Sequence, residues 1–509
     1  MMKERRRTIR LSGEDNVIVA CSDIEEGTLI PEEGITARTK IPAGYKIAAR
    51  FIKKDEKILK YNTVIGYASE DTLPGTMMHS HNIRFDEVEK DYAFCRDYRP
   101  VELLPEEKRA VFQGIVREDG KVAVRNYIAV MIAGNCAATA ARKVAEYFTE
   151  ERMREYPNVD GVIPLLTGIG CGMEMTGEPM DMLRRTMAGY IRNPNIYGTV
   201  MMALGCERNN IDGFFESCGL VPDHKLHRIV MQEVGGTQAA VALGIKAVKE
   251  MLPEANRIER RPVSAEHLVL GLQCGGSDGF SGLSANPALG RAVDLLVKNG
   301  GTAIIAEISE LFGVEHTLTC RAKTQEVGEK VVERINWWLQ YNRGKDTQIN
   351  GRVSPGNSKG GLANVLEKSL GGVKKGGSTP LNQVLEYAQP ATEKGLILMD
   401  SPGFDPVSVT GEIASGATLI AFTTGRGSCF GSVPSPTVKL ASNTLMYERM
   451  EADMDINCGS IIDGEKTLEE MGKEIFEELL EVASGKKSKS EALGIGIEEY
   501  DPWQVGVLA

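Results

Sequence analysis

The sequence predicts an α/β protein in which a small N-terminal β domain precedes two α/β domains with mainly parallel sheets. Three observations support this prediction. Short β-prone runs fill the first part of the chain, strands then alternate with helices, and a charged segment bounded by prolines, 253–262, interrupts that alternation before it restarts. The length of 509 residues is also enough for about three domains of ordinary size.

The N-terminal β domain is expected over residues 1–92. Its β-prone runs are separated by turns that contain proline and glycine, such as Pro42-Ala43-Gly44, and no long helical periodicity occurs before residue 100. The clearest runs are residues 17–20, 46–49 and 64–67. Residues 93–110, which include Pro100 and Pro105, are expected to form a linker.

The two α/β domains are expected over residues 111–260 and 261–509. In each, an apolar strand runs into a loop rich in glycine or cysteine and a helical segment follows, which is typical of a parallel sheet covered by helices. The expected strands are 127–132, 162–166, 200–204 and 229–231 in the first domain, and 267–272, 303–306, 395–399 and 418–422 in the second. Because ligands of such sheets bind beyond the carboxyl ends of the strands, these loops are the candidate site segments.

Composition and charge restrict the classes of function. Apolar residues make up 42% of the chain and charged residues 25%, as in ordinary globular proteins. With 59 basic and 70 acidic residues the net charge is −11, which argues against binding to nucleic acid or to an anionic membrane. No run approaches the ~20 apolar residues of a membrane-spanning helix, and ten cysteines are too sparse for a disulfide scaffold. We therefore expect a cytoplasmic protein with reduced thiols.

Two histidines lie close together near the end of the β domain, in His79-Ser80-His81-Asn82. Residues two apart lie on the same side of an extended segment, so both imidazoles can reach one metal ion or one anionic substrate. The whole chain has only six histidines. An exposed polar turn is the alternative interpretation.

Four cysteines each follow a predicted strand: Cys136, Cys171, Cys206 and Cys274. Thiolates in such positions suit iron or an iron–sulfur cluster, because sulfur is a soft ligand. Their spacings match no compact cluster motif, and each cysteine taken singly also fits a small buried hydrophobic residue. Two interpretations therefore stay open, a metal or redox-sensitive site and ordinary core cysteines.

Three glycine-rich polar loops, 274–279, 354–361 and 423–428, can hold an anion through backbone N–H groups, with Lys359 or Arg426 adding charge. None has the spacing of a nucleotide-binding loop, which favours a small polyanion. Ordinary α/β turns are the alternative. Potential acids and bases lie beside these loops: Glu174, Glu207, Asp278, Glu307, Glu310, Glu367, Lys368 and Asp405.

Several motifs occur together in one order. The most specific are Gln273-Cys274-Gly275-Gly276-Ser277-Asp278 and Ser354-Pro355-Gly356-Asn357. Others are Asp119-Gly120-Lys121-Val122-Ala123-Val124-Arg125-Asn126, Gly170-Cys171, Gly205-Cys206-Glu207, Ala285-Asn286-Pro287 and Thr423-Thr424-Gly425-Arg426-Gly427. In this combination the chain resembles the altronate/galactarate dehydratase family from end to end, with Ala123 in place of the glycine usual there. The N-terminal domain is similar to the β-clip (SAF) domain of altronate dehydratases.

The resemblance implies an enzyme, a hydro-lyase that removes water from an aldonate or aldarate to give a 2-keto-3-deoxy acid. The proton next to the substrate carboxylate is weakly acidic, and a divalent metal would stabilise the ene-diolate formed when it leaves. Fe²⁺ is the expected metal. Mn²⁺ or another divalent ion is an alternative, and an iron–sulfur cluster is left open.

The resemblance also suggests roles for individual residues. The candidate catalytic residues are His79, His81, Asp278 and Lys368. The candidate substrate-binding residues are Arg125, Asn126, Ser277, Asn357, Lys359 and Arg426. The candidate metal ligands are Cys171, Cys206, Glu207 and Cys274, together with His79 and His81.

D-Altronate is the predicted substrate, because the paired histidines resemble those of altronate-directed family members. Residues 360–365 and 482–487 look more like the galactarate type, so galactarate dehydratase is the first alternative. A (2R)-sulfolactate sulfo-lyase and a non-catalytic sugar-acid-binding protein follow it. The expected partners are a small anionic sugar acid and further copies of the same chain, with no nucleic acid and no membrane.

Overall fold

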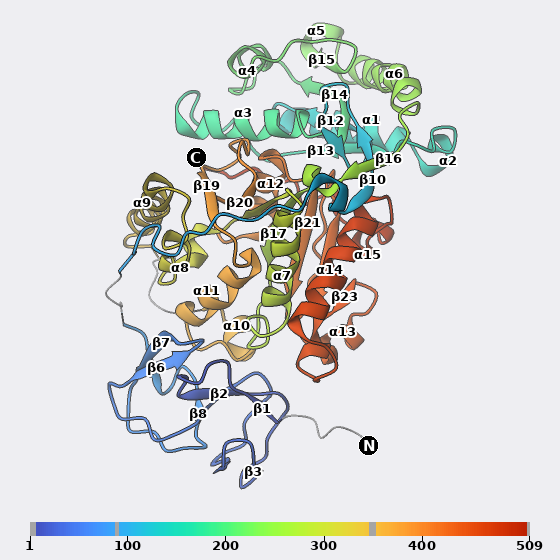
Figure 1. The fold of residues 1–509 in the computed structure, drawn as a ribbon. Coiled ribbons are helices and arrows are strands. Elements are labelled where there is room, and N and C mark those ends of the chain that lie inside the picture. Colours follow the sequence, from blue (N-terminus) through green and yellow to red (C-terminus); the bar gives the residue numbers. More distant parts are fainter. Residues whose placement is uncertain (1–6, 87–90, 346–352, 506–509) are drawn as a thin grey trace.

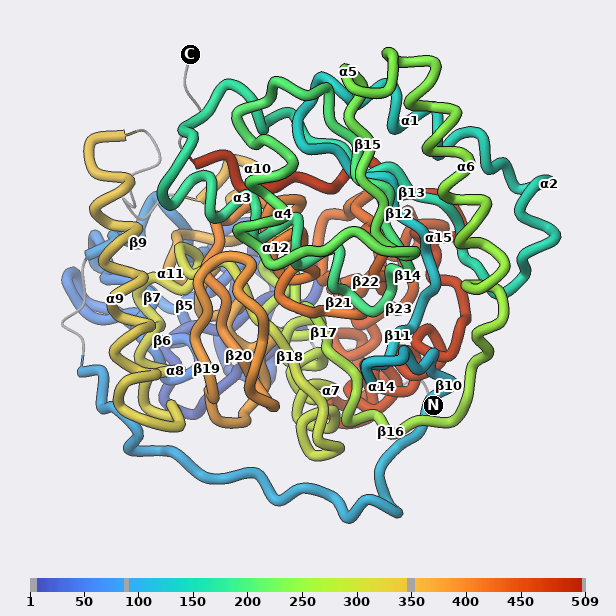
Figure 2. The backbone as a smooth tube through the Cα atoms, turned by 90° about the horizontal axis from the view of Figure 1, so that it is seen from above, coloured from blue at the N-terminus to red at the C-terminus, as the bar shows by residue number. Residues whose placement is uncertain are grey.

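The protein is described by a computed structural model that covers residues 7–86, 91–345 and 353–505. In Figure 1 a small β domain lies at the bottom, the largest sheet and its helices lie in the middle, and a second parallel sheet lies on top. Residues 91–110 run along the outside of the middle unit before the chain enters the upper one (Figures 1 and 2). The middle unit therefore contacts both of the others.

The N-terminal unit consists of short antiparallel strands, in sheets of order β1-β2-β5-β8, β6-β7-β9 and β3-β4. Fully buried isoleucines, among them Ile18, Ile30 and Ile47, form a core of its own. Its strands are β1 (Thr8–Ile9), β2 (Val17–Ala20), β3 (Leu29–Ile30), β4 (Ile35–Thr36), β5 (Lys46–Ala48), β6 (Lys57–Lys60), β7 (Thr63–Ala68), β8 (Met77–Met78) and β9 (Ile83–Arg84).

The upper unit is built on a parallel sheet of order β13-β12-β14-β15. All eight residues of its longest strand are buried, as expected for a strand covered on both faces. The strands are β12 (Tyr127–Ile132), β13 (Gly161–Leu165), β14 (Ile196–Ala203) and β15 (Leu226–Val230). The helices are α1 (Ala138–Tyr147), α2 (Glu150–Met153), α3 (Glu178–Ile191), α4 (Ile211–Cys218), α5 (Met231–Val234) and α6 (Thr237–Ala255), with the 3₁₀ turn η2 (Asn135–Ala137).

A small antiparallel sheet links the upper and middle units. Strand β10 (Val111–Val116) pairs with β11 (Val122–Ala123) on one side and with β16 (Arg261–Ser264) on the other. Strand β16 therefore returns to the segment that precedes the upper sheet, although it follows that sheet in sequence. The predicted domain boundary at 260/261 falls at the first residue of β16.

The middle unit is built on a parallel sheet of order β19-β20-β18-β17-β21-β22-β23. The chain starts at the central strand β17, continues on one side through β18, β19 and β20, and then crosses to β21 on the other side. This change of direction leaves a crevice at the carboxyl end of β17, where ligands of such sheets bind. The strands are β17 (Val269–Cys274), β18 (Thr302–Ile305), β19 (Leu381–Leu385), β20 (Gly395–Met399), β21 (Leu419–Thr424), β22 (Thr437–Ala441) and β23 (Ile456–Asn457).

Helices cover this sheet and connect it to the upper unit. Helix α7 packs on β18 and β21 and against α14, whereas α12 packs on β17 and against α3 of the upper unit. The helices are α7 (Ala285–Lys298), α8 (His316–Thr319), α9 (Gln325–Tyr341), α10 (Pro355–Lys359), α11 (Val365–Val373), α12 (Asp405–Ala414), α13 (Thr444–Arg449), α14 (Leu468–Ala483) and α15 (Lys489–Ala492). The short 3₁₀ turns η4 (Ile308–Leu311) and η5 (Lys374–Gly376) lie near the carboxyl end of β17.

The predicted fold class is confirmed, since a small β domain precedes two helix-covered parallel sheets. Each of the eight expected α/β strands is present within a few residues of its predicted position. The sequence did not predict β19, β22, β23 or the antiparallel sheet around β10. Among the described helices, none combines the length and the apolar character needed to cross a lipid bilayer.

Candidate active site

Polar side chains from four strands meet at the carboxyl edge of the seven-stranded sheet. Cys274 is the last residue of β17, Glu307 follows β18, Asp405 follows β20 and Arg426 follows β21. In a parallel sheet these positions all lie at the same edge, so residues far apart in sequence come together there.

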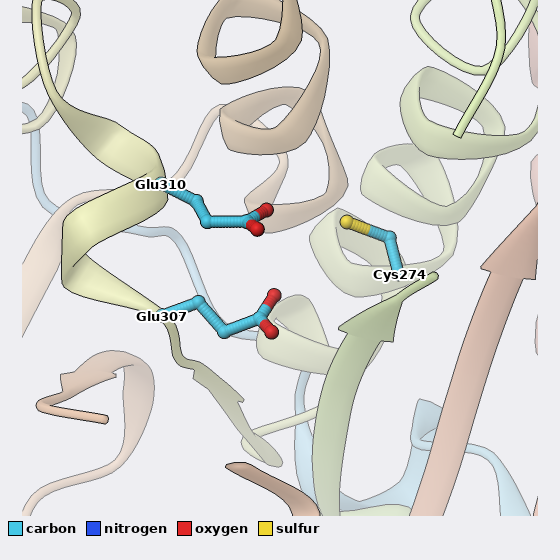
Figure 3. Close-up of side chains that lie close together, drawn as sticks. All are labelled: Cys274, Glu307 and Glu310. Carbon is cyan, nitrogen blue, oxygen red and sulfur yellow. The ribbon is translucent and has the colours of Figure 1, made fainter. Parts of the chain in front are cut away.

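Cys274, Glu307 and Glu310 form the most compact group at this edge. Figure 3 shows both carboxylates, carried by the turn that contains η4, pointing toward the sulfur at the end of β17. One donor atom from each residue lies within 4.8 Å of the other two, and the described part of the chain holds no second set of three metal-ligating side chains this close. Glu307 has a φ of +67°, a left-handed conformation that is uncommon for residues other than glycine and that is enriched at active sites.

Two lysines balance the charge of this group. Lys375 Nζ lies 3.2 Å from Cys274 Sγ and 3.7 Å from Glu307 Oε2. Lys368 Nζ lies 2.6 Å from Glu310 Oε1. Burial raises the pKa of the Cys274 thiol to about 11, despite Lys375. Burial and then the charge of Glu310 raise the pKa of Glu307 well above its ordinary value.

The residues of this group fit a divalent transition metal. Glu307 Oε2 is buried and has no hydrogen-bond partner, although its position beside two other donor atoms is one a metal could use. A set of one thiolate and two carboxylates combines soft and hard ligands, which suits an ion such as Fe²⁺. Lys375 and Lys368 neutralise the same donors in this structure.

Asp278 is a buried carboxylate held in place by neighbouring loops. Its Oδ1 accepts hydrogen bonds from Ser281 N, Ser281 Oγ and Ser442 Oγ, each at 2.8 Å, whereas Oδ2 accepts one from Asn443 Nδ2 at 3.0 Å. Burial raises the pKa of Asp278. A Cβ atom on Gly425 would stand 2.1 Å from Asp278 Cγ, so this contact requires glycine.

A cavity of about 470 Å³ lies between the N-terminal and middle units, with Asp278 in its wall. Three cationic side chains line it: Lys359, Arg426 and Arg449. The N-terminal unit contributes Asp23, Pro42, Ala43 and Tyr45. A smaller hollow, lined by Ser277 and Lys368 among others, shares Asp278. Asp278 therefore stands between a basic cavity and the lysine that contacts Glu310.

A buried ion-pair network fixes the N-terminal unit on the middle unit. Glu367 of α11 lies 2.8 Å from Lys46 of β5 and 2.7 Å from Lys60 of β6, and all three side chains are at most 5% exposed. Burial alone would raise the pKa of Glu367, but the two lysines hold it at about 2. The N-terminal unit is thus attached firmly beside the basic cavity.

The two histidines predicted as acid/base groups or metal ligands have different environments. His79 is buried and stacks on Tyr45, its Nδ1 lies 2.7 Å from the N–H of Ser80, and its Nε2 lies 3.0 Å from Ser358 O. Both ring nitrogens are therefore engaged within the protein, which makes His79 a contact between the N-terminal unit and the 354–361 loop. His81 is exposed, and the lining of the basic cavity includes neither histidine.

Arg125 and Asn126, predicted to bind substrate, serve the connection between units instead. The guanidinium of Arg125 donates to both carboxylate oxygens of Glu491 and to three backbone carbonyls, of Val124, Val482 and Lys486. These contacts use all five of its N–H donors. Asn126 is fully buried and donates to the carbonyls of Asn158 and Ala255. The structure does not bring either residue to the basic cavity.

The predicted set of metal ligands is divided between two units. Cys171, Cys206 and Glu207 lie in loops of the upper sheet, and Cys274 lies in the middle unit with Glu307 and Glu310. The carboxylate of Glu207 accepts the backbone N–H groups of Leu204 and Gly205, so it closes its own turn. The expectation of one site that contains all four residues therefore does not match this arrangement.

The remaining predicted residues lie at or beside the cavity. Lys359 and Arg426 line it, Ser277 and Lys368 line the adjoining hollow, and Asn357 is buried in α10, which lies within the 354–361 segment. Sequence reasoning missed Lys375, Arg449 and Asn443. A Lys374-Lys375 pair before Gly376-Gly377 was the available signal for the first of these.

A larger cavity, of about 890 Å³, lies between the upper and middle units. Its arginines are engaged in structural hydrogen bonds: Arg184 with Asn209, Arg185 with Tyr387 O and Arg192 with Cys218 O. None of the predicted site residues lines it. We therefore place the candidate active site at the carboxyl edge of the seven-stranded sheet.

Comparison with known families matches three segments that together span most of the chain. Residues 6–86 match the altronate/galactarate dehydratase SAF domain, residues 114–256 match the second domain of D-galactarate dehydratase/altronate hydrolase, and residues 265–508 match the C-terminal domain of D-galactarate/altronate dehydratase. The chain belongs to the altronate/galactarate dehydratase family. This is a family of hydro-lyases, and the predicted resemblance is confirmed.

Characterised relatives span nearly the full length of the chain. The altronate dehydratase of Bacillus subtilis is 34% identical over 480 residues, which cover 94% of this chain and 95% of the relative. The galactarate dehydratase (L-threo-forming) of Escherichia coli is 36% identical over 488 residues, covering 94% and 93%. The altronate dehydratase of Escherichia coli is 31% identical over 486 residues, covering 95% and 96%. Relatives with two different substrates are thus about equally similar to this chain.

Proposed function

We propose that this protein is a metal-dependent dehydratase of a six-carbon sugar acid, with its active site between the N-terminal unit and the seven-stranded sheet. The observation that carries this proposal is the basic cavity with Asp278 in its wall, at the same edge of the seven-stranded sheet that carries the Cys274, Glu307 and Glu310 group. A sugar acid offers a carboxylate to Lys359 and Arg426 and several hydroxyls to the polar loops. Association of the chain with further copies of itself also remains a prediction.

Each chemical requirement of the dehydration has a candidate group. Cys274, Glu307 and Glu310 would hold the metal, which supplies Lewis-acid stabilisation of the negative charge that develops on the substrate carboxylate. Asp278 Oδ2 accepts a single hydrogen bond, so it has capacity for the proton next to that carboxylate. Its raised pKa favours the base role.

Lys368 is the candidate acid for the departing hydroxyl. Burial would lower the pKa of its ammonium group, but Glu310 outweighs burial and raises it. The group therefore carries a proton at neutral pH. Lys368 lines the same small hollow as Asp278, so the proposed acid and the proposed base lie near each other.

D-Altronate is the proposed substrate, and galactarate is the second candidate because its dehydratase is 36% identical to this chain. The test incubates the anaerobically purified protein with Fe²⁺, a thiol and D-altronate, galactarate or (2R)-sulfolactate in separate reactions. We expect a 2-keto-3-deoxy acid from altronate. Product from galactarate alone would reassign the substrate, sulfite from sulfolactate would reassign the reaction, and no product from any of them would favour a binding role.

Two variants test whether the reaction takes place at the proposed site. Lys368→Met and Asp278→Asn are each expected to lower kcat at least about 100-fold, the range associated with loss of a general acid or base. Lys298→Met, which alters an exposed lysine on α7, is the control and should keep full activity. Full activity in both site variants would remove the catalytic assignment.

A further inference from the structure

Three of the four exposed cysteines of this chain lie at one edge of one sheet. Cys136, Cys171 and Cys206 follow β12, β13 and β14, and these strands are direct neighbours in the parallel sheet of the upper unit. The fourth exposed cysteine, Cys429, lies in the middle unit. Free cysteine is among the most buried residue types, so three exposed thiols at a single sheet edge need an explanation.

The loops that carry the three thiols touch one another. A Cβ atom on Gly134, two residues before Cys136, would stand 2.9 Å from Glu207 Cγ and 3.5 Å from the carbonyl carbon of Gly170. Glu207 directly follows Cys206, and Gly170 directly precedes Cys171. All three cysteines are therefore within two residues of one point of contact.

A buried asparagine fixes this arrangement. The backbone N–H of Asn209 donates to Gly170 O at 2.8 Å, and its Nδ2 donates to Ala133 O at 3.0 Å. Asn209 lies three residues after Cys206 and is completely buried. It links the loops after β12, β13 and β14, so the backbones beside the three thiols are held together while the thiols stay exposed.

We propose that Cys136, Cys171 and Cys206 bind an iron–sulfur cluster in the upper unit, separate from the Cys274 group. Thiolates are the usual protein ligands of such clusters. The carboxylate of Glu207 is committed to its own turn, which leaves the three sulfurs as the donors of this edge. Three thiolates leave one iron of a four-iron cluster without a cysteine ligand, and a small oxygen ligand would complete its coordination.

The spacing of the thiols favours a cluster over a single ion. At a metal–sulfur distance of about 2.3 Å, two thiolates on one ion cannot be more than about 4.6 Å apart. Among the described residues, the group at Cys274 is the one whose donor atoms meet a limit of 4.8 Å, and it does not include these cysteines. In a cluster each thiolate binds a different iron, so its ligands stand farther apart. The inference does not depend on the proposed dehydratase site.

The test measures iron and acid-labile sulfide in the full-length protein purified without oxygen, together with its EPR spectrum after reduction. We expect about four sulfides per chain and about four irons from the cluster, in addition to any Fe²⁺ bound at the Cys274 group. Cys136→Ser, Cys171→Ser and Cys206→Ser should each lose most of the sulfide and the EPR signal. Cys429→Ser, the control for an exposed cysteine, and Cys274→Ser should keep both. Iron without sulfide, or a cluster that survives all three substitutions, would overturn the inference.

Alkylation of the unmutated protein gives a second measurement that does not depend on how the variants fold. In the anaerobic protein, iodoacetamide should modify Cys429 and spare the three cluster cysteines, as read by peptide mass spectrometry. Removal of iron with a chelator should make all four reactive. Equal modification of all four before chelation, or a disulfide between two of the three, would contradict the cluster. Because dehydratase activity is not measured, failure of the proposed function would leave this result unaffected.

Discussion

At the residue scale, Arg125 shows how a buried charge with a structural role differs from one available for chemistry. Its side chain is 2% exposed and pairs with Glu491, which is 9% exposed, and it has no N–H donor left for a ligand. The two lysines beside Cys274, in contrast, contact acidic groups that a metal ion could bind in their place. In this structure the Arg125 guanidinium is thus used for contacts within the fold.

We predict that Arg125→Ala destabilises the protein by about 3–5 kcal/mol, because it leaves Glu491 buried without its counter-ion. The KM for the sugar acid should stay unchanged in the folded fraction. Urea unfolding and steady-state kinetics measure the two effects. Arg142→Ala, which breaks an exposed pair with Glu498, is the control and should cost less than about 1 kcal/mol. A raised KM without loss of stability would restore the substrate-binding role.

A second prediction at this scale concerns the metal. Cys274→Ser should weaken Fe²⁺ binding by at least about tenfold, because the replacement removes the soft ligand of the group. Anaerobic titration calorimetry measures the affinity. Cys458→Ser is the matched control, since Cys458 is also a fully buried cysteine but lies outside the group. Equal Fe²⁺ affinity in both variants would place the metal elsewhere.

At the scale of elements, β5, β6 and α11 are joined through the carboxylate of Glu367. Its folded-state pKa of about 2 lies below the ordinary 4.5, so the ionised form is stabilised by folding. This contribution is complete above pH 4.5 and is lost as the pH falls toward 2. The attachment of the N-terminal unit should therefore weaken in acid.

We predict that the free energy of unfolding falls between pH 4.5 and pH 2 in the unmutated protein, and that Glu367→Gln removes this part of the fall. At pH 7 the same variant should be less stable by about 3–5 kcal/mol, because two buried lysines lose their partner. Urea unfolding across the pH range measures both. Glu25→Gln, which affects an exposed pair with Lys40, is the control. An unchanged acid profile in Glu367→Gln would contradict the assignment.

The elements also show what could be predicted from the sequence. Strands such as β20 were found because a parallel strand buried on both faces is a continuous apolar run. Cys274 and Asp278 were found because they follow such a run in a glycine-rich loop. Lys375 was not found, because it lies 101 residues from Cys274 and only the order of strands and turns brings the two together. The structural contact of His79 was not predicted for the same reason, because its partner Ser358 lies 279 residues away in the sequence.

At the scale of the whole molecule, the basic cavity exists only because two units close against each other. The 42–45 turn of the N-terminal unit forms one wall, and loops of the middle unit form the other. Three glycines permit this approach. A Cβ atom on Gly279 would stand 2.1 Å from Gly44 O, and one on Gly361 would stand 2.7 Å from the same oxygen. Closure of the cavity therefore depends on the absence of side chains at these positions.

We predict that Gly279→Ala displaces the 42–45 turn and raises the KM for the sugar acid by about tenfold or more, since a misplaced wall costs binding and orientation. Fe²⁺ content should not change, because the Cys274 group belongs to the middle unit alone. Steady-state kinetics and metal analysis of the same preparations measure the two effects. Gly13→Ala is the matched control in the N-terminal unit, because its added Cβ would meet no atom within 4 Å. Loss of Fe²⁺ together with activity in Gly279→Ala would mean that the substitution disturbs the metal group, whereas an unchanged KM would mean that the N-terminal unit does not form part of the substrate site.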